Sequence, residues 1–124
     1  MILMIEPRAC PRPRVTRRGT VYYPKTYQDW VKECSKLLAH MTLPNGPLHI
    51  TVIFVFKRVN RLPRTGGRVI HDRRPDLDNC VKSLLDALPI EDDKIISSLM
   101  AQKYYASSDE TPHIELKIKP HKPQ

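Results

Sequence analysis

The stretch RRPDLDNCVKSLLDAL, residues 73–88, carries the clearest structural pattern in the chain. Apolar residues recur here every three or four positions, as on the buried face of an amphipathic helix. These residues are Leu77, Cys80, Val81, Leu84, Leu85 and Leu88. Asp76 stands at the expected N-cap position, and Pro89 ends the pattern. Asp78, Lys82 and Asp86 follow at four-residue steps, so they share one edge of the predicted helix.

A second amphipathic helix is predicted upstream, from about residue 26 to residue 41. Its apolar stripe includes Trp30, Cys34 and Leu38, which would serve either the core of one chain or an interface. The sequence PNGP at 44–47 is typical of a turn and ends this helix.

Strands are predicted where residues are β-branched or alternate between apolar and polar. Residues 48–57 indicate a central strand, and residues 114–118 a half-exposed one. Residues 94–105 are predicted to form a strand, although their apolar spacing also fits a helix. Short strands are expected at Ile2–Glu6 and Thr20–Tyr23.

Basic residues are concentrated in two segments of this chain, whose net charge is +8. Residues 7–25 form an arm rich in proline and arginine, without an acid, and residues 58–75 form a long basic loop. A surface that served only solubility would mix the two signs, so this distribution predicts a nucleic-acid partner. The arginines expected to bind DNA phosphates are Arg12, Arg14, Arg17, Arg18, Arg61, Arg64, Arg68, Arg73 and Arg74.

The length of 124 residues predicts a single domain over residues 1–124. No apolar run is long enough for a membrane span, and the N-terminus does not resemble a secretory signal. The three cysteines are widely spaced, which argues against a disulfide framework and a zinc site and favours the cytoplasm. The histidines lack metal-ligand spacing, and His71 is interpreted as a loop residue.

Acidic residues gather between residues 76 and 93, beside the basic loop. Each has an ordinary structural explanation: a helix cap at Asp76, an ion-pair ladder along the helix, and a turn at Asp92-Asp93. The functional alternative is a magnesium site, because Mg²⁺ prefers oxygen ligands and binds a few carboxylates together with substrate phosphate. Asp76 and Asp78 would then meet an acid from the loop before the next strand.

The pattern DLDN at 76–79, Lys82, DAL at 86–88 and DD at 92–93 resembles the signature of the RusA family of Holliday junction resolvases. The arm RPRVTRRG at 12–19 is similar to that of phage and prophage members. One departure is Pro75, which stands where a second arginine commonly precedes the motif. The departure affects a basic contact and leaves the predicted metal ligands intact.

This resemblance implies a compact α/β (α+β) domain, with a mixed sheet packed against two main helices, that acts as a homodimer. It implies Mg²⁺-dependent cleavage of four-way DNA junctions, with Mn²⁺ as an expected substitute and no small-molecule cofactor. The implied metal ligands are Asp76, Asp78 and Asp93, with the adjacent family acid Asp92 as a further candidate, and the implied catalytic lysine is Lys82. A two-fold symmetric dimer would also match the two equivalent strands of a four-way junction.

Three other functions stay open on the sequence alone. The protein would be a nuclease of broader range that acts on forks or flaps, a basic DNA-binding module without catalysis, or a general ribonuclease. The first differs from a junction resolvase in its substrates, the second in lacking metal-dependent cleavage, and the third in cutting RNA.

Overall fold

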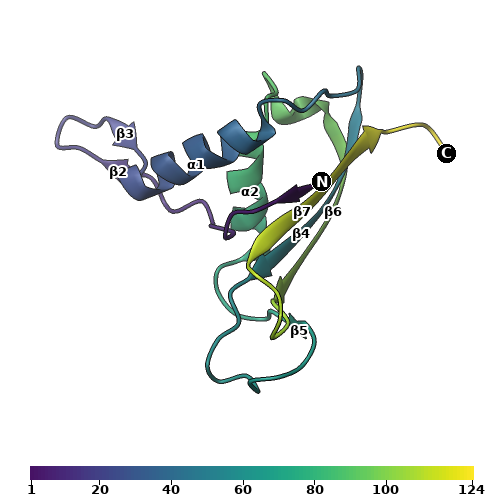
Figure 1. The fold of residues 1–124 in the computed structure, drawn as a ribbon. Helices are drawn as coiled ribbons and strands as arrows, with labels where there is room; N and C mark the ends of the chain where they lie inside the picture. The colour runs from purple at the N-terminus through teal and green to yellow at the C-terminus, as the bar shows by residue number, and fades with distance from the viewer.

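The central strand of the fold is β4, Leu48–Phe56, as the β-branched sequence predicts. In the computed structural model, which describes residues 1–124, β4 pairs with a parallel neighbour on one side and an antiparallel neighbour on the other. The strand order is β1-β7-β4-β6-β5 (Figure 1). The other strands of this sheet are β1 (Ile2–Leu3), β5 (Val69–Ile70), β6 (Ile96–Tyr105) and β7 (His113–Pro120).

Two helices, α1 (Lys25–Leu38) and α2 (Leu77–Ala87), cover one face of this sheet (Figure 1). Their apolar stripes pack against the inward side chains of the strands and form one hydrophobic core. Cys34 and Cys80 are fully buried in this core, and burial raises the pKa of both thiols to about 11. The mixed α+β domain implied by the resemblance is therefore confirmed.

The basic arm contains a hairpin that the sequence interpretation only half predicted. Strand β3 (Val21–Tyr22) lies within the predicted segment, whereas its partner β2 (Arg14–Val15) lies in the part of the arm where no strand was predicted. The two strands are joined by a tight turn in which the Gly19 amide donates to the Thr16 carbonyl. Gly19 has a φ of 83°, which glycine adopts without steric penalty and which a turn of this length requires.

Other boundaries differ from the predicted ones by a few residues. Strand β1 ends at Leu3 and does not reach Glu6, because the Ile5 amide donates to the Leu3 carbonyl within the same segment. The long basic loop includes the short strand β5, which pairs with the end of β6. A 3-10 turn, η1 (Asp93–Ile95), comes before β6, so this strand begins at Ile96.

His71 lies in the loop, as predicted, but it is buried there. Its ring stacks on Tyr105 at a centroid distance of 4.1 Å and meets the edge of Phe56 at 4.8 Å. Burial, together with the charge of Lys103, lowers the pKa of His71. Neither helix has the length and apolar character that a membrane span requires.

Candidate metal and DNA site

Asp76 and Asp78 lie at the start of α2, where the sequence predicts them. Asp76 occupies the N-cap position, but its side chain makes no capping hydrogen bond. Asp78 accepts only a local bond, from the Asn79 amide at 2.9 Å. Both side chains are exposed, so the ordinary capping explanation leaves the Asp76 carboxylate unused and available to a ligand.

Lys103 fixes the backbone that leads into Asp76. Its ammonium group donates to the Pro75 carbonyl at 2.6 Å and also to the Arg73 carbonyl. Lys103 therefore acts on the position of Asp76, and sequence reasoning missed it. A signal was present, because strand alternation places this lysine on the same side of β6 as Ala101 and buried Tyr105.

An open depression of about 830 Å³ adjoins Asp76. Asp76 lines it together with two of the predicted DNA-binding arginines, Arg12 and Arg74. The other lining residues are Ala9, Cys10, Pro11, Pro75 and Asn79. The arm is held here because the Cys10 amide donates to the Asn79 carbonyl at 2.9 Å. Two arginines and an aspartate that line one depression suit a site that receives both a phosphate and a cation.

Lys82 pairs with Asp86 and not with Asp78. The Lys82 ammonium lies 2.5 Å from one Asp86 oxygen, and the hydroxyl of buried Tyr27 donates to the other at 2.6 Å. The bond to Asp86 raises the pKa of Lys82, and burial together with the same carboxylate raises that of Tyr27. Only half of the predicted ion-pair ladder forms, and α1 fixes the acid that holds Lys82.

Asp93 lies at the opposite end of α2 from Asp76 and Asp78. The helix has 11 residues, which span about 16 Å at 1.5 Å per residue. Asp93 comes just before the start of β6, whereas Asp76 is tied to Lys103 near its end, about 23 Å further along the strand. The three carboxylates therefore do not converge within one chain, contrary to the expectation that a helix start and a distant loop meet.

The two neighbouring acids between α2 and β6, Asp92 and Asp93, differ in their contacts. Asp92 caps η1, because its carboxylate accepts a hydrogen bond from the Lys94 amide at 2.9 Å. The Asp93 side chain is exposed and takes part in no hydrogen bond or ion pair within the chain. Asp93 is thus the acid with free oxygen atoms.

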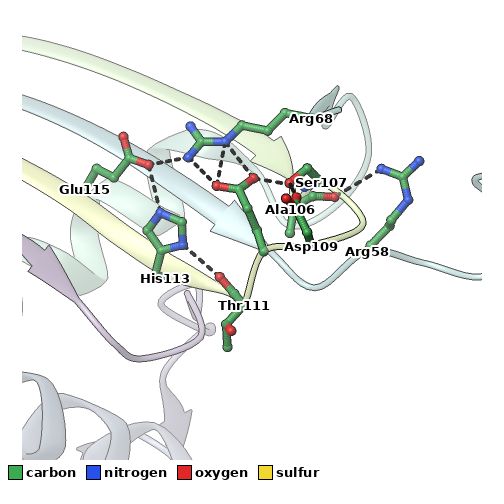
Figure 2. A network of polar contacts seen from close by, with 9 residues as sticks. Arg58, Arg68, Ala106, Ser107, Asp109, Thr111, His113 and Glu115 are labelled. Carbon is green, nitrogen blue, oxygen red and sulfur yellow. Dashed lines mark hydrogen bonds and ion pairs between the residues drawn. The ribbon is translucent and has the colours of Figure 1, made fainter. Parts of the chain in front are cut away.

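Another group with metal-ligand chemistry, Glu110, His113 and Glu115, lies on and beside β7 (Figure 2). Its potential ligand atoms lie within 4.8 Å of one another. Arg68 already binds both carboxylates, with distances of 2.7 Å to Glu110 and 2.5 Å to Glu115. His113 adds a contact of 2.8 Å to Glu115. A metal ion would have to displace Arg68, so the contacts favour an internal ion-pair network.

The predicted DNA-binding arginines fall into two groups by their contacts. Arg68 is engaged in this network, and its bonds to Glu110 lower the pKa of that carboxyl to about 2. Arg61 lies over the Tyr105 ring and donates to its hydroxyl at 3.2 Å. The remaining ones are exposed and form no ion pair: Arg12, Arg14, Arg17, Arg18, Arg64, Arg73 and Arg74.

Comparison with known protein families gives one match that covers nearly the whole chain. The sequence profile described as Endodeoxyribonuclease RusA matches residues 5–119. A comparison with curated proteins gives no match.

Proposed function

Because the chain belongs to the RusA endodeoxyribonuclease family, we propose that it resolves four-way DNA junctions by metal-dependent hydrolysis of the phosphodiester backbone. The observation that carries this proposal is that the carboxylate of Asp76 makes no capping bond, and that Asp76 lines a depression together with Arg12 and Arg74. Family membership supports the nuclease activity, whereas junction selectivity and the metal are proposed. A DNA substrate and three unpaired cysteines fit the cytoplasm of a bacterial cell or phage-infected host.

The donor set fits a hard divalent cation. Asp76, Asp78 and Asp93 offer exposed carboxylate oxygens, which Mg²⁺ and Mn²⁺ both prefer. Asp92 is the weaker candidate because its carboxylate caps η1. When bound there, the ion would activate a water molecule and neutralise charge on the phosphate.

The separation of Asp93 from the other two acids supports a site shared between two copies of the chain. Strand β6 pairs with β5 only at Tyr104 and Tyr105, so the outer edge of its remaining residues has no strand partner. Antiparallel pairing of two such edges would bring the start of one β6, with Asp93, beside the end of the other, with Asp76. We propose this two-fold arrangement for the homodimer.

Apolar side chains along the same edge support the arrangement. Leu99 is 45% exposed and Met100 57% exposed. Leu99 also lines a shallow groove of about 360 Å³ with Leu77 and Val81, and Asp78 lies at its side. A second copy would cover these side chains and would surround the metal ligands with less water.

Side chains of the chain itself would do the remaining chemistry. Arg12 and Arg74 would bind phosphates on either side of the scissile bond. Lys82, one helical turn from Asp78, would stabilise charge that develops on the phosphoryl oxygens. Asp86, fixed by Tyr27, would keep the Lys82 ammonium on this edge of α2.

Substitution of a ligand tests the catalytic part of the proposal. Asp76→Asn should lose cleavage of a synthetic four-way junction in Mg²⁺, by at least about 100-fold, because a carboxylate ligand is removed while DNA contacts remain. Binding, measured by gel shift without metal, should persist. Lys82→Met should likewise lose cleavage and retain binding. Full cleavage by Asp76→Asn would contradict the assignment, and absence of wild-type cleavage would favour a binding module.

Mixing two inactive variants tests the shared site. If Asp78 of one copy works with Asp93 of the other, a heterodimer of Asp78→Asn and Asp93→Asn keeps one intact site. About half of the dimers should be of this kind after random exchange, and they should nick one strand of the junction. The matched control, Asp76→Asn with Asp78→Asn, leaves no intact site and should stay inactive. Inactivity of both mixtures would contradict the shared site.

A substrate panel separates the proposed function from a broader branched-DNA nuclease. Equal cleavage rates on junctions, forks and flaps would favour the broader activity. A labelled RNA in the same panel tests for a general ribonuclease.

A further inference from the structure

The β2–β3 hairpin combines free arginines with uncovered apolar side chains. Every residue from Arg12 to Tyr22 is exposed, and Figure 1 shows the hairpin projecting beyond α1, away from the sheet. Val15 is 64% exposed and Val21 61% exposed. The two valines are directly opposite each other in the register, so they form one apolar patch on one face of the hairpin. Burial in the core therefore does not explain this pair.

We propose that the hairpin enters the branch point of a DNA junction, where Val15 and Val21 contact exposed base faces. This inference rests on the proposed function, because it takes branched DNA as the substrate. Arg17 and Arg18, at the tip, would hold phosphates around the opening. The valine pair would then select branched DNA over duplex, in addition to the phosphate contacts expected from the sequence.

The dimensions and chemistry of the hairpin suit this partner. A two-stranded ribbon fits a DNA groove about 12 Å wide, and apolar side chains are known to enter between base steps. Unstacking a base step in duplex costs a few kcal/mol, but at a branch point the stack is already interrupted. The arm carries no acidic residue between 7 and 25, so its charge favours a polyanion over a second basic copy of the chain.

The position of the hairpin links it to the candidate metal site. Arg12, at the base of the hairpin, lines the same depression as Asp76. From Arg12 to Arg17 an extended strand reaches at most about 17 Å, which corresponds to about five base steps. The turn is held internally, because the Thr20 amide donates to the Thr16 hydroxyl at 3.0 Å. A hairpin of this reach connects a cut site with a nearby branch point.

A fluorescent base at the branch tests the inference without relying on cleavage. A four-way junction carries 2-aminopurine at the crossover, where its fluorescence rises when the base loses its stacking partner. The Asp78→Asn protein, without metal, should raise this fluorescence. Adding Val15→Thr and Val21→Thr should abolish the rise and weaken junction binding by about tenfold, because a hydroxyl then meets an apolar base face. Threonine keeps the shape and β-propensity of valine.

Matched variants separate insertion from simple charge. Arg17→Gln with Arg18→Gln should weaken binding to junction and duplex alike, whereas the threonine pair should weaken junction binding alone. An unchanged fluorescence rise in the threonine pair, or equal losses on both DNAs, would overturn the inference. Val21→Thr alone replaces one of the two valines. Its fluorescence rise should therefore lie between that of the protein with both valines and that of the threonine pair. Neither the fluorescence nor the binding measurement requires hydrolysis of DNA. If the wild-type protein failed to cleave, the nuclease proposal would be contradicted, but these measurements would still test the insertion of the hairpin.

Discussion

The basic arm and the basic loop have similar compositions, but two arginines of the loop, Arg58 and Arg68, are held by contacts within the fold. In the loop, residues 58–75, Arg58 donates to the carbonyls of Pro63, Gly67 and Ala106. Arg68 binds two glutamates, and Figure 2 shows it near the contact between Arg58 and Ala106. In the arm, residues 7–25, the four arginines between 12 and 18 form no ion pair. Clustered arginines therefore indicate a polyanionic partner only where the fold supplies no internal acceptor.

The difference arises from what lies beside each segment. The loop folds against the connection between β6 and β7, which presents the Ala106 carbonyl and the Glu110 carboxylate. The hairpin of the arm projects from the fold and meets no acid. Three variants test the contrast, in order of expected effect.

The largest effect is expected from Arg58→Met. This change leaves three carbonyl groups without their charged donor and frees the loop, so it should lower the free energy of unfolding by about 2–3 kcal/mol. Urea unfolding followed by circular dichroism measures the loss. A stability equal to that of the wild type would mean that the loop does not depend on this arginine.

A smaller effect, on DNA binding, is expected from Arg17→Gln with Arg18→Gln. Loss of two phosphate contacts should reduce the slope of log affinity against log salt by about 2, which is about tenfold in affinity between 50 and 200 mM salt. Fluorescence anisotropy with labelled DNA gives the slope, and the melting temperature should not change. A salt slope identical to that of the wild type would exclude both arginines from the DNA contact.

The smallest effect is expected from Arg68→Gln, about 1 kcal/mol at neutral pH. Arg68 holds the pKa of Glu110 at about 2, below its ordinary value of 4.5. This pair therefore contributes stability above pH 4.5 that is lost as the pH falls toward 2. Unfolding curves between these values should be flatter for the variant. Parallel acid curves for the two proteins would contradict the stabilising role of the pair.

The sequence predicted the elements whose pattern is local. Apolar spacing located the ends of α1 and α2 to within three residues, and β-branched residues located β4. The motif also placed Asp76 and Asp78 at a helix start. Local periodicity carries this information because burial on one face repeats with the period of the helix or strand.

Pairings between distant residues could not be read from the same patterns. The partners of Arg68 lie more than 40 positions away, and nothing local distinguishes this arginine from Arg64. The positions of Asp76 and Asp93 at opposite ends of α2 follow from the path of the chain, which the spacing between them does not specify. Lys103 was predictable in part, as a lysine on the inward side of a strand.

The length of strand β6 sets the distance between Asp93 and Asp76 in the candidate site. The strand begins directly after η1, which contains Asp93. Near its other end, Lys103 donates hydrogen bonds to the backbone that precedes Asp76. A single-residue insertion within β6, before Lys103, would turn Lys103 to the opposite side of the sheet. It would also lengthen the strand by about 3.3 Å. The length of this strand should accordingly tolerate no change.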